Sequence, residues 1–453
     1  MLALIIEAFT ADEVGAGRSP RAIAAVIGRM ITNGTLPEGT RMPTVRQVSR
    51  ALGVSPTTVS EAWKALVTAG AIETRGRNGT IIRAGRPMYQ PLRYRGISAG
   101  PGRFELDLSS GIPDPDLLPD LAPIVARVSR QSLTSSYLDH PVLPELAELL
   151  AESWPFSAER LTVVDGALDA LDRVGQLILR LGDRVIVEDP CFPPLLDLLE
   201  RLGCEVIGVG IDHDGIRTDE LEVALTRDPT ALFLQPRAQN PTSVAMSQER
   251  AGEIAALVAD NRTIIVEDDH ANEISAAPLV SLGSHLPART IHIRSFSKSH
   301  GPDLRLAAIG GAGEILDSLD SRRLLGPGWS SRILQTVLVE LIGDAAATET
   351  LAVARWTYAH RRSVVSAALD AAGIVHHRGD GVNLWMPVDH EQSALVTLAS
   401  QGVGAAPGEP FMLADTGSHL RVTVGLIPEQ RLAETSDLLV EAAVAGGAPV
   451  GSR

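Results

Sequence analysis

The feature that most constrains this 453-residue sequence is a break in its pattern at residues 85–103. This stretch, GRPMYQPLRYRGISAGPGR, is rich in glycine, proline and arginine and has no sustained helical or strand periodicity. Such a composition is typical of a semi-extended linker, because proline restricts the backbone and removes a donor. The chain is also too long for one simple core. We therefore predict a small domain at residues 17–84, a linker at 85–105 and a larger domain at 106–453.

The two sides of this linker differ in charge. Residues 1–85 contain ten basic and six acidic residues, a net charge of +4, whereas the remainder carries −19. A basic module joined to an acidic body is expected of a DNA-binding domain fused to another domain. A small protein-interaction module with a solvated basic face is the alternative.

Within the basic module, apolar residues recur at helical spacing in residues 23–31, 45–52 and 59–67. Ser55 followed by Pro56 is a typical helix start, and Asn78-Gly79 between two alternating runs favours a hairpin turn. Three helices followed by a hairpin predict a winged helix-turn-helix domain. Polar side chains off the buried face of the third helix can reach bases and phosphates, and arginines at the hairpin tip can touch the minor groove. The candidate DNA-binding residues are Thr44, Ser55, Thr57, Thr58, Ser60, Lys64, Arg75 and Arg77.

In the larger domain, apolar runs at residues 185–187, 231–234, 263–266 and 291–293 alternate with helical stretches. This alternation predicts an α/β domain with a mainly parallel sheet. Ligands in such domains bind beyond the carboxyl ends of the strands. The polar residues that follow these runs are therefore the candidates for a site.

Three of these residues, Asn240, Asp268 and Lys298, form a chemically consistent set. A lysine amine condenses with an aldehyde, and a buried carboxylate keeps a nearby pyridine nitrogen protonated. The chain has only two lysines, Lys64 and Lys298, against 38 arginines, and a guanidinium does not form imines. Genome base composition explains the scarcity of lysine but not its positions.

Further residues can complete a site for a phosphorylated ring. Ser295, Ser297 and Arg305 offer donors to a phosphate, and Phe192 can stack on a ring. The segment Gly166, Ala167 and Leu168 opens a predicted helix, whose free N–H groups attract the same phosphate. Taken singly, each residue is more often a cap, a turn or a solvated side chain. The order and spacing of the whole set carry the prediction.

The segment LPEGTRMPTVRQVSRALGVSPTTVSEAWKALVTAGAIETRGRNGT resembles the GntR superfamily of winged-helix bacterial regulators, from about Arg18 to Ala84. The resemblance implies that Arg46 contacts DNA. Pro56 stands where many members have an arginine that reads guanine, so the operator sequence cannot be transferred.

Residues 106–425 resemble fold-type I aminotransferases in the order of their motifs, LDLSSGIPDPDLLP, YLDHPVLPELAELLAE, QNPTS, VEDDH, SFSKSHGPDLRL and LRVTVG. The resemblance implies a large subdomain at about 137–325 and a small subdomain from 106–136 plus 326–453. It also implies pyridoxal 5'-phosphate as the cofactor, held by Lys298 as an aldimine. In the implied site, Asp268 pairs with the pyridine nitrogen, Asn240 contacts the ring hydroxyl, Ser295, Ser297 and Arg305 bind the phosphate, Tyr137 reaches the neighbouring subunit's phosphate, and Arg421 clamps a ligand carboxylate.

Some positions depart from this family pattern. His270 replaces a tyrosine that bonds the ring hydroxyl, and Ala238, Ser243 and Val142 replace a common histidine and two glycines. An imidazole can still donate to a phenolate, so His270 remains a candidate cofactor-binding residue. These changes argue against efficient catalysis more than against cofactor binding.

A winged helix fused to this body is the layout of the MocR subfamily, whose members resemble transcription regulators and form head-to-tail homodimers. We predict a regulator that binds operator DNA and responds to an amine or amino acid. In the predicted mechanism the effector forms an external aldimine, displaces Lys298 and shifts the DNA-binding state of the dimer. The alternatives are an active aminotransferase with a DNA-binding head, and a repressor whose body only dimerises.

The remaining features concern the cellular setting. No apolar run reaches the length of a membrane span, and the first residues lack the basic start of a signal peptide. The two cysteines, Cys191 and Cys204, have no disulfide-framework or metal-ligand spacing. We therefore expect a cytoplasmic protein with no membrane partner and no metal site.

Overall fold

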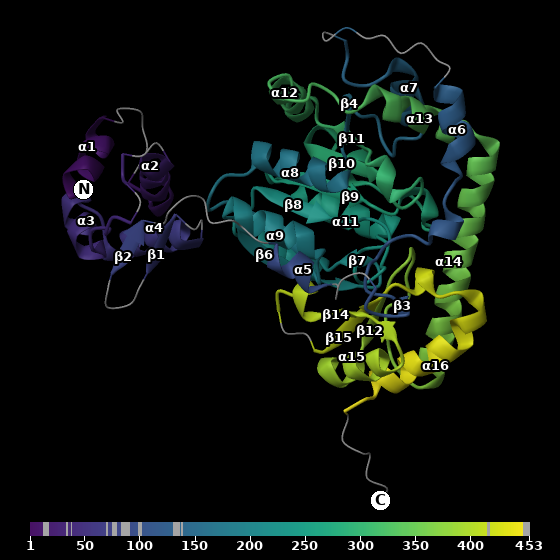
Figure 1. Ribbon diagram of the computed structural model, residues 1–453. Helices are drawn as coiled ribbons and strands as arrows, with labels where there is room; N and C mark the ends of the chain where they lie inside the picture. The colour runs from purple at the N-terminus through teal and green to yellow at the C-terminus, as the bar shows by residue number, and fades with distance from the viewer. Residues whose placement is uncertain are drawn as a thin grey trace, which may run out of the picture. The chain divides into compact units, whose positions relative to one another are not determined.

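The computed structural model describes residues 1–11, 18–32, 35–37, 39–68, 71–74, 79–82, 91–97, 102–129, 136, 139–414 and 417–446. These residues form two compact units, one built on residues 1–91 and one that contains residues 92–178, 185–196 and 207–453 (Figure 1). The predicted site residues Arg75, Arg77 and Tyr137 lie outside the described residues.

The N-terminal unit is a winged helix-turn-helix domain, as predicted. Its hairpin strands pair antiparallel, with Ile72 opposite Ile82. A helix that the sequence analysis did not anticipate precedes residue 17 and adds Ile5 to the buried core. The elements are α1 (Leu2–Ala11), α2 (Pro20–Thr32), α3 (Val45–Leu52), α4 (Pro56–Thr68), β1 (Ile72–Thr74) and β2 (Thr80–Ile82).

Local signals set the boundaries of α3 and α4. The Thr44 side chain accepts from the backbone N–H of Gln47, whose side chain accepts from the Thr44 N–H, and this capping box starts α3. Gly53 ends α3 with a φ of 67°, a left-handed conformation that glycine adopts without strain. Ser55 accepts from the N–H of Thr58 at 3.1 Å and caps α4.

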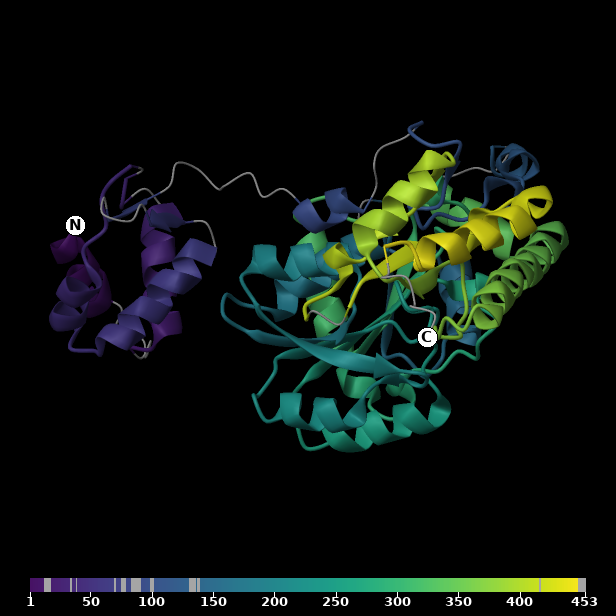
Figure 2. The same ribbon diagram turned by 90° about the horizontal axis from the view of Figure 1, so that it is seen from below.

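The second unit is built on an eight-stranded mixed sheet, with helices on both faces (Figure 2). The four apolar runs predicted as strands are the strands β5, β8, β9 and β10, which are parallel to one another. Neighbouring strands at both ends run antiparallel, so the sheet is not parallel throughout. In spatial order the strands are β4 (Arg160–Val164), β11 (Ala307–Gly311), β10 (Thr290–Ser295), β9 (Ile264–Asp269), β8 (Ala231–Leu234), β5 (Arg184–Asp189), β6 (Glu205–Asp212) and β7 (Gly215–Ile216).

Two small sheets and a set of helices complete this unit. The small sheets are β12 (Leu384–Pro387) with β15 (His419–Val422) and β14 (Ala406–Pro407), and β13 (Val403–Gly404) with β3 (Leu106–Asp107). The helices are α5 (Leu92–Gly96), α6 (Leu121–Val128), α7 (Pro144–Glu152), α8 (Ala167–Ile178), α9 (Pro193–Leu202), α10 (Thr218–Leu225), α11 (Gln248–Val258), α12 (Gly313–Arg323), α13 (Arg332–Ile342), α14 (Ala345–Ala371), α15 (Glu391–Ser400) and α16 (Leu432–Ala443). No helix among the described residues is long and apolar enough to cross a bilayer.

Two hydrophobic cores lie on either side of the predicted boundary between subdomains. Helices α6 and α13, both assigned above to the small subdomain, pack with α7 in one core through Ile124, Leu146 and Leu338. The hydrophobic core around the small sheets contains Leu106 and Leu108, and its next member along the chain is Val365, in the second half of α14. The boundary at residue 326 stays a prediction, because the spacing of apolar residues shows that a helix is buried but not against which core.

The parallel register of the central strands determines where the site forms. Ile293 of β10 lies opposite Asp268 of β9, and Leu234 of β8 lies opposite Glu267. The chain leaves all three strands at the same edge of the sheet. Residues that follow these strands are thereby brought together although they are far apart in sequence.

Candidate functional site

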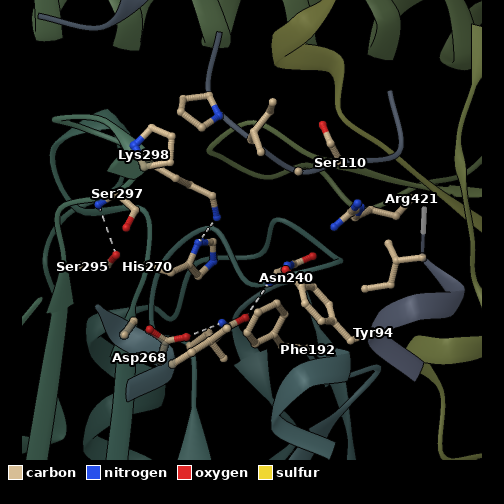
Figure 3. A pocket seen from close by; sticks show the side chains of 18 of the residues that line it. Tyr94, Ser110, Phe192, Asn240, Asp268, His270, Ser295, Ser297, Lys298 and Arg421 are labelled. Atoms are coloured by element: carbon tan, nitrogen blue, oxygen red, sulfur yellow. Dashed lines mark hydrogen bonds between the residues drawn. The ribbon is translucent and has the colours of Figure 1, made fainter. Parts of the chain in front are cut away.

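A cavity of about 440 Å³ lies at this edge of the sheet (Figure 3). Lys298 and Arg421 point into it from opposite sides. The structure brings together at this cavity the predicted residues Ala167, Leu168, Phe192, Asn240, Asp268, His270, Ser295, Ser297, Lys298, Arg305 and Arg421.

Asp268 and Asn240 are held at the floor of the cavity by Gln235. The Gln235 side chain donates to one carboxylate oxygen of Asp268 at 2.8 Å and accepts from the Asn240 backbone N–H at 2.8 Å. The other Asp268 oxygen and the Asn240 side-chain oxygen are buried and have no protein partner. Buried polar atoms are rarely left unpaired, so these two atoms indicate a ligand that supplies hydrogen bonds here.

Both ring nitrogens of His270 have hydrogen-bond partners, and one of these partners is Lys298. Its Nε2 lies 2.9 Å from the carbonyl oxygen of Ala238, and its Nδ1 lies 2.5 Å from Nζ of Lys298. A carbonyl only accepts, so Nε2 carries the proton and Nδ1 accepts from the lysine. Burial and the neighbouring lysine charge hold the pKa of His270 well below its usual value. From the sequence we expected His270 to donate to a phenolate. In this arrangement the neutral ring has no second N–H to donate, because its only N–H points to the Ala238 carbonyl.

The ionisable groups at the centre of the cavity are both perturbed by burial. Burial raises the pKa of Asp268 to about 6, and Gln235 and the Lys298 charge oppose this rise. Burial lowers the pKa of Lys298 to about 8, although the Asp268 charge opposes the change. A lysine with a depressed pKa has a larger fraction of nucleophilic amine near neutral pH.

Groups suited to an anion gather where α8 begins. Gly166 precedes the helix with a φ of 104°, and a Cβ at this position would lie 2.9 Å from Nη2 of Arg305. Only glycine therefore allows the guanidinium to approach so closely. The first N–H groups of α8 and the Arg305 cation are the groups that bind phosphate in proteins. Ser295 ends β10 at this side, and its hydroxyl accepts from the Ser297 N–H at 3.3 Å.

Arg421 supplies a second cationic group. It is buried on β15, donates through Nη2 to the carbonyl of Ser109, and leaves Nε without a protein partner. Its guanidinium carbon lies 5.3 Å from the centre of the Phe411 ring. Burial lowers the pKa of Arg421 to about 10. A buried guanidinium of this kind is suited to a carboxylate, with which it forms strong paired hydrogen bonds.

Sequence reasoning missed several residues that line the cavity or hold its floor. Gln235 directly follows β8, and its place before the Pro236 turn was the one available signal. Tyr94 and Ile97 come from the segment interpreted as a linker, and nothing in their local pattern indicates a pocket. The Ser109–Pro113 segment also lines the cavity, and within it Gly111 adopts a φ of 67° beside Arg421.

In the N-terminal unit, the described DNA-binding candidates separate into two groups. The hydroxyls of Thr44 and Ser55 cap α3 and α4, so they already have structural partners. Arg46 is exposed on α3, whereas the exposed candidates on α4 are Thr57, Ser60 and Lys64, with Thr58 half-buried. Exposed polar and basic side chains on these two helices are what a contact with DNA would require.

Comparison with protein families matches both parts of the chain. Residues 20–82 match the family described as bacterial regulatory proteins of the gntR family. Residues 105–435 match the family described as aminotransferase class I and II.

Curated relatives match over nearly the whole chain. The vitamin B6 salvage pathway transcriptional repressor PtsJ of Salmonella typhimurium is 35% identical over 422 residues, which cover 92% of this chain and 96% of the relative. The pyridoxine biosynthesis transcriptional regulator PdxR of Corynebacterium glutamicum is 28% identical, with 92% and 95% covered.

Solved structures match the second unit. A kynurenine aminotransferase of Pyrococcus horikoshii superposes with a TM-score of 0.68 at 21% identity, covering 75% of this chain and 90% of its own. The α-aminoadipate aminotransferase LysN of Thermus thermophilus gives a TM-score of 0.68 at 24% identity, covering 78% and 96%. At these identities the likeness establishes the fold of the body.

The depressed pKa of Lys298 leads to a test on ligand-free protein. An amine-selective reagent attacks only the neutral amine, so we expect the rate of Lys298 labelling to rise with pH to a midpoint near 8 and then to level off. The measurement is mass spectrometry of the Lys298 peptide, with Lys298→Arg identifying the signal. A rate still rising at about pH 10, as for an ordinary lysine, would contradict the depressed pKa.

Proposed function

The chain belongs to the MocR group of GntR-type transcription regulators, and on that premise we propose that it is a DNA-binding regulator that uses pyridoxal phosphate to respond to an amine or amino acid. The observation that carries the proposal is the convergence of Lys298, Asp268 and Arg421 on one cavity, in a chain whose other unit is a winged helix. The first two residues suit a cofactor, and the third suits a carboxylate.

The residues present fit pyridoxal phosphate. The unpaired oxygen of Asp268 suits a protonated pyridine nitrogen, and the Asn240 amide suits the ring hydroxyl. Arg305, Ser295, Ser297 and the start of α8 suit the phosphate. When bound, this cofactor supplies an aldehyde that condenses reversibly with primary amines, those of Lys298 or of an effector.

The Lys298 amine would need a hydrogen-bond partner if an effector amine replaced it on the cofactor. Nδ1 of His270 accepts a hydrogen bond from Nζ of Lys298 at 2.5 Å. Because Nε2 is committed to the Ala238 carbonyl, the ring is fixed in the orientation that receives the lysine. His270 would therefore give the Lys298 amine a hydrogen-bond partner whenever that amine is not bonded to the cofactor.

Regulation requires that the ligand favours one arrangement of the two units. An effector shifts this equilibrium only by its difference in affinity for the two states. A carboxylate on Arg421 and an amine at the Lys298 position would fix both ends of an amino acid. We further propose a head-to-tail homodimer, in which Tyr137 reaches the neighbouring subunit's phosphate, and DNA contacts from Arg46 and the exposed polar face of α4.

A second candidate signal is pyridoxal phosphate itself. The relative PtsJ, at 35% identity, is named for the vitamin B6 salvage pathway, and PdxR is named for pyridoxine biosynthesis. In this case occupancy of the cavity by the cofactor would be the signal. DNA affinity would then change on adding the cofactor to ligand-free protein, without any amine.

Lys298 is the residue whose replacement tests the proposal. We expect Lys298→Ala to abolish any effect of amino acids on DNA affinity, because the proposed signal is the displacement of Lys298 by the effector amine and the variant has no amine to displace. The measurement is fluorescence anisotropy with a DNA fragment selected by the holoprotein from a random pool. Lys298→Arg is the matched control that keeps the positive charge, and it should fail equally. An unchanged response in either variant would contradict the proposal.

Arg46 tests the DNA contact of the N-terminal unit. In helix-turn-helix domains the first helix of the motif crosses the DNA backbone, so Arg46 on α3 is placed for a phosphate. We expect Arg46→Ala to weaken binding to all sequences alike and to lower the slope of log affinity against log salt by about 1. An affinity and a salt slope equal to those of the wild type would place the DNA contact elsewhere.

A further inference from the structure

Helix α5 lies in the linker by sequence, yet it forms part of the cavity wall. Tyr94 on α5 and Ile97 just after it both line the cavity. Figure 3 shows the Tyr94 ring close to that of Phe192, on the side of the cavity where Arg421 enters. The linker therefore places a side chain in the site that the proposed function assigns to the effector.

Specific contacts hold α5 against the body. Nη1 of Arg93 lies 3.3 Å from the carbonyl oxygen of Met412 and 3.4 Å from that of Pro410. A Cβ added to Gly96 would lie 3.4 Å from Cγ of Pro410, so the helix backbone approaches this loop closely. These contacts hold α5, which has only five residues, against the loop at residues 410–412.

A continuous set of contacts joins α5 to Arg421. Ile97 is 5% exposed and packs in one apolar cluster with Trp385 and Phe411. The Phe411 ring in turn lies under the Arg421 guanidinium, 5.3 Å from its central carbon. A carboxylate that binds Arg421 would therefore contact a side chain that packs on Phe411, and Phe411 packs in one cluster with Ile97, just after α5.

The lining of the cavity also indicates the class of ligand. Among the described lining residues the charged groups are Asp268, Lys298, Arg305 and Arg421, and the cofactor and one carboxylate use all four. The other lining residues from α5 and just after it, and from the 109–113 segment, carry no charge: Tyr94, Ile97, Ser109, Ser110, Gly111, Ile112 and Pro113. A second ligand charge would have no partner there and would lose its hydration.

We propose that Tyr94 is a specificity residue that contacts the side chain of an apolar α-amino acid, and that α5 thereby reports ligand binding to the DNA-binding domain. The inference rests on the proposed function and deepens it. A ligand that touches Tyr94 stabilises the state in which α5 is docked. In sequence, α5 is the first helix after the winged-helix domain, so its docked state is the one that we expect to change the DNA-binding state.

The test uses full-length holoprotein, with two readouts for each variant. The first is the shift of the cofactor's visible absorption on titration with L-phenylalanine, and the second is the change in anisotropy of a DNA fragment selected by the holoprotein. We expect Tyr94→Ala to raise the apparent Kd for L-phenylalanine about ten-fold, equivalent to about 1.4 kcal/mol, and to reduce the change in DNA affinity. L-aspartate should bind the wild type at least about ten-fold more weakly than L-phenylalanine.

Two further variants control for structure. Tyr94→Phe keeps the ring and should retain both responses. Leu92→Ala alters an α5 side chain that is 71% exposed and does not line the cavity, and it should behave as the wild type. The visible band of each variant before titration reports whether the cofactor site is intact.

The outcomes separate this inference from the proposed function. If the wild type responds to L-phenylalanine and Tyr94→Ala responds equally, Tyr94 is not a sensor and the proposed function stands. If Tyr94→Ala loses the visible band before titration while the controls keep it, Tyr94 serves cofactor binding and the inference is overturned. If no amino acid changes the spectrum or the DNA affinity of the wild type, the proposed function fails and this inference fails with it.

Discussion

The rest of the site depends on the buried carboxylate of Asp268, of which only one oxygen has a hydrogen-bond partner in the protein. Removing a carboxylate from water is costly, and one hydrogen bond from Gln235 compensates only one of its two oxygens. The remaining oxygen is buried without a protein partner and suits a ligand with a protonated ring nitrogen. The carboxylate charge opposes the loss of the Lys298 proton, although burial is the larger cause of the pKa shift of each group. The parallel register of β8, β9 and β10 is what brings them together.

Much of this arrangement could be predicted from the sequence, because local chemistry determines it. The four apolar runs are strands, Ser55 and Pro56 start a helix, and the residues after the strands converge. The family pattern supplied Arg421, whose partner segment lies more than 300 residues earlier in the chain.

What the sequence did not predict depends on tertiary packing. The side on which α13 packs is a property of a core that no local window contains. The first helix, α1, was interpreted only as a poor signal peptide, although Ile5 is fully buried in the winged-helix core. The hydrogen bonds of His270 could not be foreseen, because they depend on the carbonyl of Ala238, which has a φ of 47°. The role of Tyr94 could not be foreseen for the same reason, because a linker residue lines the cavity only when the linker packs against the body.

In the proposed function, the body would keep the amine chemistry of an aminotransferase and use it for regulation. The chain's two lysines make the central claim directly testable. Holoprotein is reduced with borohydride, digested, and analysed by mass spectrometry for a phosphopyridoxyl group on lysine. The account predicts the modification on the peptide that contains Lys298 and none on the peptide that contains Lys64. Modification of neither lysine in protein purified with added pyridoxal phosphate, or of Lys64 alone, would contradict it.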